Sequence, residues 1–189
     1  MTEPGTALLL MDFQNGVLAG IGDKRECVVA NARKAADASR DLGVQIVHVR
    51  VAFANQDYDS VPPRNKGFSP LAANRLLGGA STAAAPIPEL APTGSDIIVV
   101  KTRFGAFSTT NLDTHLRARG IDTLVLAGVS TSGVVLSTVR DAADKDYRLY
   151  VLSDVCADPD DAVHNTLMSS VFVRQADVVS CSDWLQKAS

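Results

Sequence analysis

The sequence has little of three features that mark whole classes of protein. Its three cysteines, Cys27, Cys156 and Cys181, are an odd number at wide, irregular spacing, which favours free or buried thiols over a disulfide framework. No basic run is present, and 18 Lys and Arg against 21 Asp and Glu give a net charge of −3, so we expect no nucleic-acid partner. The longest apolar runs are strand-sized, well short of the roughly 20 residues that span a bilayer. We therefore expect a cytoplasmic protein without membrane contact.

The overall composition is that of an ordinary folded domain. The chain has 189 residues, of which 46% are hydrophobic and 21% charged. A chain of this length buries roughly 70% of the surface that its unfolded form exposes, so it needs no disulfide or metal to complete a core. With no internal repeat and no linker, we expect one domain over residues 1–189.

Short apolar runs, rich in β-branched residues or leucine, recur along the chain between polar or glycine positions. They cover residues 6–11, 44–51, 96–101, 123–129 and 148–152, with a weaker sixth run at 177–181. The runs are nearly continuous rather than alternating, which is typical of strands buried on both faces in a parallel sheet. Helical patterns lie between them, at 25–42, 111–119, 132–146 and 160–173. This alternation predicts a three-layer, Rossmann-like α/β/α sandwich.

The chain between residues 52 and 95 breaks this alternation. It has no strong strand pattern, many Pro, Gly and Ala residues, and one candidate short helix near 70–77. A connection longer than about 15 residues is usually a lid, a binding loop or an oligomer contact. Its basic stretch Arg64-Asn65-Lys66 is either solvated loop charge or a source of cations for an anionic ligand.

Chemically useful residues follow the ends of three predicted strands. Asp12 follows the first run, Lys101 ends the third, and a turn from Gly128 to Val134 follows the fourth. Ligands in open parallel sheets bind beyond the carboxyl ends of the strands, so these groups are expected to converge. Nucleotide-binding glycine motifs are missing at these positions, and the histidines lack metal-ligand spacing. We therefore expect no cofactor and no metal.

Three motifs surround these residues. They are Leu-Met-Asp-Phe-Gln-Asn around Asp12, Val-Val-Lys-x-Arg-x-x-Ala-Phe around Lys101, and Leu-Ala-Gly-Val-x-Thr from Leu126, which leads into a helix reading Leu-Ser-Thr-Val-Arg-Asp-Ala-Ala. In this order they resemble the isochorismatase-like hydrolases, over nearly the whole chain. The resemblance implies a six-stranded parallel sheet of order 3-2-1-4-5-6 and a homodimer or larger homo-oligomer. It also implies catalytic roles for Asp12 and Lys101, and a cis peptide bond between Val129 and Ser130.

The chain departs from this family where the cysteine-hydrolase branch has its nucleophile. Alignment of the turn places Val134 at that position, and a shift of one residue would place Gly133 there, as in the isochorismatases proper. A valine side chain cannot form a thioester. None of the three cysteines of the chain stands where it would replace this thiol, and only Cys156 is expected at the edge of the sheet where Asp12 and Lys101 lie. The missing metal-binding residues argue against nicotinamide as the substrate.

Two functions are compatible with a family member that lacks the thiol. The first is hydrolysis of an enol ether or a C–N bond in a small polar metabolite, with Asp12 as acid or base and Lys101 as its electrostatic partner. The second is a catalytically inactive subunit that binds a small molecule or acts as a scaffold. Retention of both charges favours the first, because a buried charged pair is costly to keep.

Neighbouring residues are candidates for substrate binding. We expect Phe13 and Phe107 to wall the pocket, Gln14 to orient Asp12 or a substrate group, and Arg103 to bind an anion. The turn contributes Val129, Ser130, Thr131 and Gly133 as a cradle for an anion, and the backbone N–H of Val134 is a further donor. The hydroxyls of Ser130, Thr131 and Ser132 are weaker candidates for a substitute nucleophile, because helix capping explains them equally well.

Overall fold

The structure, a computed structural model, describes residues 5–188 and contains one six-stranded sheet in which every pairing is parallel. The strands are β1 (Thr6–Met11), β2 (Gln45–Val51), β3 (Ile97–Lys101), β4 (Thr123–Val129), β5 (Arg148–Ala157) and β6 (Asp177–Val179). Their order is β3-β2-β1-β4-β5-β6, so the predicted fold and strand order are confirmed. Every residue of β1 and β4 is buried, as the continuous apolar runs predict for central strands.

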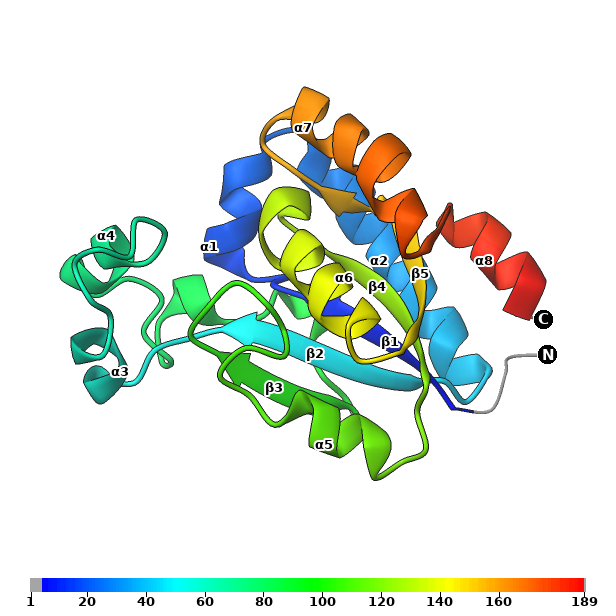
Figure 1. The fold of residues 1–189 in the computed structure, drawn as a ribbon, viewed down its shortest axis with the longest axis horizontal. Helices are drawn as coiled ribbons and strands as arrows, with labels where there is room; N and C mark the ends of the chain where they lie inside the picture. The colour runs from blue at the N-terminus through cyan, green and yellow to red at the C-terminus, as the bar shows by residue number, and fades with distance from the viewer. Residues whose placement is uncertain (1–4, 189) are drawn as a thin grey trace.

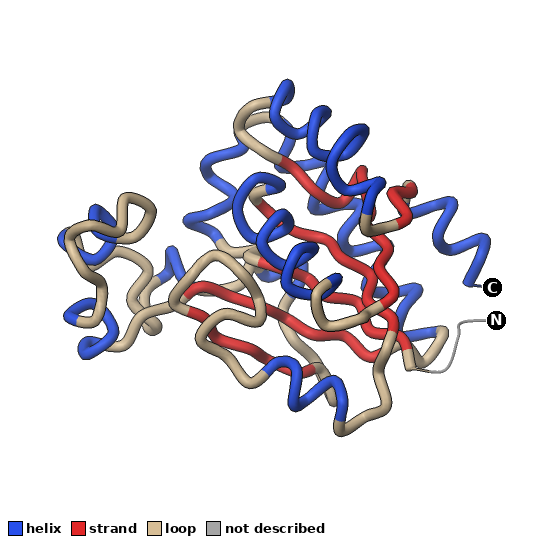
Figure 2. The backbone as a smooth tube through the Cα atoms, in the orientation of Figure 1, coloured by secondary structure: helices blue, strands red, loops and turns tan. Residues whose placement is uncertain are grey.

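Helices cover both faces of the sheet (Figures 1 and 2). They are α1 (Asn15–Leu18), α2 (Lys24–Asp41), α3 (Asn55–Asp59), α4 (Ser69–Ala73), α5 (Leu112–Arg117), α6 (Leu136–Ala143), α7 (Asp161–Thr166) and α8 (Cys181–Ala188). The core on one face joins β1 and β4 to α2 and α8, and the core on the other face joins them to α5 and α6. No helix in the described range is both long and apolar enough to cross a membrane.

Several predicted boundaries differ from the structure. The predicted helix 132–146 begins with a π-helical turn, Thr131–Val135, before α6. The predicted helix 160–173 divides into α7, a π-helical turn and a short 3-10 segment. The fifth strand continues past residue 152 to Ala157, and the sixth ends at Val179, so that Cys181 begins α8 rather than ending a strand.

The long connection between β2 and β3 forms a lobe beyond the carboxyl end of the sheet. It carries α3 and α4 and extends to the left of the sheet in Figure 1. Its own apolar cluster packs Phe53, Tyr58, Val61 and Phe68 against Val51, the last residue of β2. The lobe is therefore fixed to the edge of the sheet at which the predicted functional residues lie.

Candidate active site

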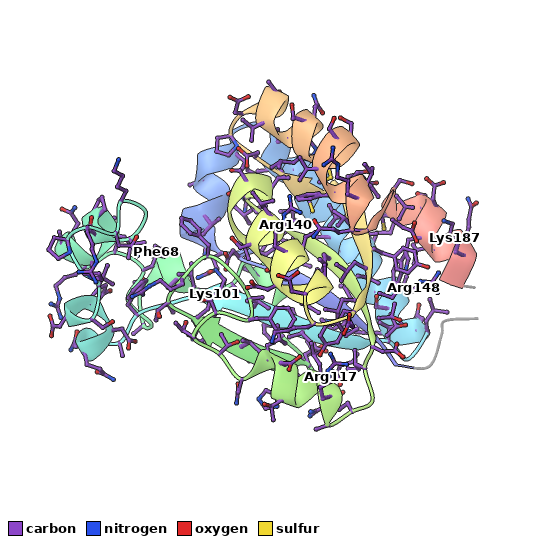
Figure 3. All side chains as sticks on the ribbon, in the orientation of Figure 1. Phe68, Lys101, Arg117, Arg140, Arg148 and Lys187 are labelled. Atoms are coloured by element: carbon purple, nitrogen blue, oxygen red, sulfur yellow. The ribbon has the colours of Figure 1, made fainter. Side chains whose placement is uncertain are left out.

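The ends of β1, β3 and β4 meet at one edge of the sheet, as predicted. In the parallel register, Met11 pairs with Gly128, and Val51 pairs with Lys101. Asp12, Lys101 and the turn after β4 are therefore held at the same edge of one sheet. Figure 3 labels Phe68 in the lobe and Lys101 at the part of the sheet that lies toward the lobe.

Asp12 and Lys101 form a buried ion pair. The Lys101 Nζ donates to Asp12 Oδ2 at 2.8 Å and to the backbone oxygen of Arg103 at 3.1 Å. Lys101 is only 2% exposed and Asp12 only 5%. The second carboxyl oxygen, Asp12 Oδ1, is buried without a hydrogen-bond partner in the protein. Buried polar atoms are nearly always bonded, so an orphaned carboxyl oxygen beside a cavity is a candidate contact for a ligand.

Burial raises the pKa of the Asp12 carboxyl above its ordinary value. Removal of the carboxyl from water is the larger influence, and the Lys101 charge opposes it. The side chain is therefore more readily protonated than a solvent-exposed aspartate. A carboxylic acid in this state is able to give a proton as well as to take one.

A cavity of about 180 Å³ lies against this ion pair. It is smaller than the roughly 300–1,000 Å³ typical of sites for drug-sized ligands, so it suits a small molecule. Most of its walls are apolar, and Asp12, Lys101 and Ser130 are the polar side chains in them. The remaining lining residues are Val17, Val51, Gly67, Phe68, Leu71, Leu77, Phe104, Val129, Gly133 and Val134.

The turn after β4 brings both candidate nucleophile positions to the cavity. Gly133 and Val134 line it, and the peptide bond between Val129 and Ser130 is cis, as the resemblance predicts. A Cβ atom added to Gly133 would lie 2.7 Å from Ser130 Oγ, so a side chain at this position would require the Ser130 hydroxyl to move. Val134 supplies a side chain to the lining and is 2% exposed.

Only one of the three hydroxyl residues in the turn faces the cavity. Ser130 lines it, whereas Thr131 is fully buried and its Oγ1 lies 2.8 Å from His164 Nδ1. Ser132 is exposed, and its backbone N–H donates to Asp158 Oδ2 at 2.7 Å. Thr131 and Ser132 thus tie the turn to the segment around α7.

The other predicted binding residues lie outside the lining of the cavity. Gln14 is buried, and its side-chain amide bonds to the backbone of Val51 and Ala84 at 2.7–2.9 Å. Phe13 packs in the core on the α2 face. Phe107 stacks on Tyr147, with ring centroids 5.9 Å apart. These residues support the site from outside or belong to other parts of the core.

The aromatic residues that do line the cavity belong to other segments. Phe68 comes from the lobe and Phe104 from the loop after β3, and their ring centroids lie 4.6 Å apart. The Arg103 guanidinium lies 5.7 Å from the Phe68 ring centroid, next to the cavity rather than in its wall. The positions of aromatic residues in the sequence did not identify Phe68 and Phe104, although the prediction that residues 52–95 form a lid, a binding loop or an oligomer contact pointed to the segment that carries Phe68.

No thiol or metal cluster is available to this cavity within residues 5–188. Cys156, on β5, belongs to the core on the α5 and α6 face of the sheet, and burial raises the pKa of its thiol to about 12. A thiol with such a pKa is not a nucleophile at neutral pH. The described residues contain no group of three or more His, Cys, Asp or Glu side chains arranged to hold a metal ion.

Comparisons with known proteins agree with this architecture. The isochorismatase domain matches the chain over residues 6–183. The isochorismatase family protein YecD of Escherichia coli O157:H7 is 34% identical over 95% of this chain and 94% of its own length. The ureidoacrylate amidohydrolase RutB of Acinetobacter baylyi is 32% identical over 80% of this chain and 70% of its own. The structure of N-carbamoylsarcosine amidase from Thermoplasma acidophilum superposes with a TM-score of 0.78 at 26% identity, covering 96% of this chain and 97% of that one.

Proposed function

This chain belongs to the isochorismatase family, and from that membership we propose that it hydrolyses a small polar metabolite without a thiol nucleophile, by acid–base chemistry at Asp12 and Lys101. One observation carries the proposal. Asp12 has one oxygen bonded to Lys101 and the other buried and unbonded, and both residues line the cavity. A proton at this oxygen is positioned for transfer to a bound molecule.

Hydrolysis of an enol ether fits this arrangement best. Protonated Asp12 donates to the vinyl carbon, and the substrate becomes an oxocarbenium ion while Asp12 becomes a carboxylate that Lys101 stabilises. Water adds to the cationic carbon, and the resulting hemiketal breaks into an alcohol and a carbonyl compound. The proton released by water returns to Asp12. The alkyl side chain of Val134 takes no part in any of these steps.

Other cavity residues have supporting roles in this proposal. Val129, Ser130 and Gly133 contact the substrate, and Val134 limits its size at the position that a nucleophile occupies in the thiol branch. Arg103 attracts an anionic substrate group next to the cavity. Gln14 and Thr131 position the backbone on which Asp12 and the turn depend.

C–N bond hydrolysis is the second candidate, because two of the similar proteins are named as an amidohydrolase and an amidase. In that reaction Asp12 acts first as a base. Its carboxylate takes a proton from water while the water oxygen adds to the carbonyl carbon, and the proton then passes to the departing nitrogen. The two chemistries require opposite starting states of Asp12, which makes them separable by pH.

Product detection by mass spectrometry tests the proposal on three probes: isochorismate, ureidoacrylate and N-carbamoylsarcosine. We expect Asp12→Asn to lower turnover by about 10²–10⁴-fold, the usual contribution of general acid–base catalysis. Asp141→Asn is the matched control, because Asp141 lies on α6 outside the cavity lining and burial also raises its pKa. Full activity of Asp12→Asn would refute the mechanism. Absence of turnover on every probe would favour the inactive, ligand-binding alternative.

The pH profile separates acid from base catalysis. With Asp12 as the acid, turnover falls as pH rises through the pKa of Asp12, because the proton is lost. With Asp12 as the base, turnover falls as pH decreases through the same pKa. Lys101→Met removes the charge that opposes the raised pKa, so the Asp12-dependent limb moves to higher pH in either case.

We also propose cytoplasmic action as a homodimer or larger homo-oligomer. The location rests on the free state of Cys27, Cys156 and Cys181, which suits a reducing compartment. The assembly rests on the family resemblance, and light scattering on the purified protein measures it directly. A monomer in that measurement would remove the assembly from the proposal.

A further inference from the structure

A second cavity, of about 300 Å³, lies on the α2 face of the sheet. It is lined by residues of β1, β2 and β3, by the residues after β1, and by the segment from Pro86 to Pro92. Its apolar lining consists of Leu10, Phe13, Val49, Pro86, Leu90, Pro92 and Ile98, and its polar lining consists of Gln14, His48 and Arg50. This volume is at the lower end of the range of roughly 300–1,000 Å³ found for small-molecule sites, which are mostly apolar with a few placed polar groups.

Arg50 is the charged group that this cavity offers to a ligand. Its Nη1 donates to the backbone oxygen of Ala84 at 3.3 Å, and it has no carboxylate partner among the described residues. A guanidinium has five N–H donors, so most of them are left for another acceptor. The side chain is half-buried, which strengthens its attraction for an anion relative to a fully solvated arginine.

The other charged groups around the cavity leave this cation unopposed. His48 Nε2 donates to Asp96 Oδ2 at 3.0 Å, and Asp96 is also paired with Arg40 at 3.0 Å. Burial lowers the pKa of His48, so its ring is neutral at pH 7. Glu89, in the segment from Pro86 to Pro92, is exposed, and its ion pair is with Arg25, whose Nη2 lies 3.9 Å from Glu89 Oε1.

We propose that this second cavity binds a small monocarboxylate with an apolar body, its carboxylate on Arg50 and its hydrocarbon part against Leu10, Leu90 and Ile98. A planar guanidinium matches a carboxylate with two parallel hydrogen bonds. The apolar lining then contributes affinity by removing hydrocarbon from water. Ile98 is 54% exposed in the free protein, so a ligand has apolar surface to cover at the open side of the cavity.

The two cavities share one stretch of chain. Asp12 lines the first cavity, and Phe13 and Gln14 line the second, because the backbone turns out of β1 at Asp12, where φ is 60°. Occupation of the second cavity therefore contacts the residues that follow Asp12. The binding site nevertheless stands on its own residues and does not depend on the proposed reaction.

Isothermal titration calorimetry with hexanoate as the probe tests the site, and 1-hexanol is the neutral analogue of the same chain length. We expect hexanoate to bind more tightly than 1-hexanol and to lose affinity as salt is added. Arg50→Gln is expected to weaken hexanoate about tenfold or more, the usual effect of losing a hydrogen bond to a charged group. Ile98→Glu places a like charge at the exposed rim with little risk to folding, and it is expected to weaken hexanoate similarly.

Asp12→Asn distinguishes the two cavities, because hexanoate is also able to approach Lys101 in the first one. Hexanoate affinity unchanged in Asp12→Asn and weakened in Arg50→Gln and Ile98→Glu would support the proposal. Several results would overturn it: no binding of hexanoate at millimolar concentration, equal binding to wild type and Arg50→Gln, or a change confined to Asp12→Asn. Loss of self-association in Ile98→Glu, without any effect of hexanoate, would assign this face to contact between copies of the chain instead.

Discussion

Asp12 combines three constraints at the residue scale: a positive φ, burial and a single bonded oxygen. Its φ is 60°, in the left-handed region that Asp and Asn enter more readily than most other residues with a side chain. This backbone conformation turns the chain out of β1 while its N–H donates to Val49 at 2.8 Å. The turn holds the carboxyl at the edge of the sheet, where Lys101 reaches it.

The position of Val134 at the cavity predicts that a cysteine placed there reacts readily with an alkylating reagent. We expect Val134→Cys to be alkylated by iodoacetamide about tenfold or more faster than Val135→Cys, because the former lines the cavity and a helix N-terminus favours the thiolate. Val135 is the matched control, since it lies in the same turn but is fully buried in the core. Peptide mass mapping measures both rates, and exposed Cys27 is the internal reference. Equal rates for the two variants would contradict the placement of Val134 at the cavity.

Sequence reasoning found the residues that end strands and missed those that the lobe brings in. Asp12 and Lys101 were predictable because buried strands are readable as apolar runs and their ends meet at one edge. Phe13 was expected in the same pocket, yet the backbone turns at Asp12, where φ is 60°, and Phe13 packs in the core on the α2 face. Phe68 ends a stretch of turns and irregular backbone, where no periodicity of the sequence fixes the position of a side chain. Only the segment that carries it was therefore predictable.

At the scale of elements, the Thr131–Val135 turn depends on a bond from outside it. Thr131 Oγ1 lies 2.8 Å from the ring of His164 on α7, and Asp158 accepts the N–H of Ser132. We expect Thr131→Val to lower kcat more than it raises KM, because the turn shifts while the cavity walls remain. Thr131→Ser keeps the hydroxyl and is expected to restore kcat. Steady-state kinetics on the probe that is turned over measures both constants.

Thr138 provides the control for that prediction. It is a fully buried threonine on α6 whose Oγ1 accepts the N–H of Ala106 at 3.0 Å, outside the turn. Thr138→Val is expected to lose about 0.5–1.5 kcal/mol of stability with kcat retained. A similar loss of kcat in both valine variants would show that the turn is sensitive to stability alone. The shift of the turn in Thr131→Val is also measurable without a substrate. If Thr131→Val is combined with Val134→Cys, the alkylation rate of the introduced thiol is expected to differ from that in Val134→Cys alone.

The differences in element boundaries have local polar causes. The fifth strand was predicted to end at residue 152, because Ser153 and Asp154 interrupt its apolar run. In the structure Ser153 Oγ donates to Val179 at 3.2 Å, and Asp154 Oδ1 accepts the N–H of Cys181 at 2.7 Å. These side chains are satisfied by the neighbouring segment, so β5 continues through them. Such long-range partners are invisible to a pattern of hydrophobicity.

At the scale of the whole molecule, the titration of buried groups sets the dependence of stability on pH. Burial lowers the pKa values of His48 and His164 below their ordinary value of 6.5. For a group with a lowered folded-state pKa, the stabilising contribution is present above the unfolded pKa and is lost as pH falls through the folded one. Asp12 acts in the opposite direction. Its raised pKa makes the folded state bind a proton more tightly, so its contribution is present below about 3.8, the ordinary pKa of an aspartate, and is lost as pH rises through the folded value.

We therefore expect the free energy of unfolding to fall as pH decreases from 7.5 through 6.5 to 5.5. The ceiling for a single group is about 1.4 kcal/mol per pH unit, and the solvent around His164 makes its share smaller than that of His48. Urea unfolding followed by circular dichroism at each pH measures the slope. His48→Gln combined with His164→Gln should flatten it, because neither position then takes up a proton. Asp12→Asn should steepen it wherever Asp12 titrates in the folded state, because the opposing contribution is gone. A wild-type free energy that is constant over this range would contradict the assignment of both histidines as buried and neutral.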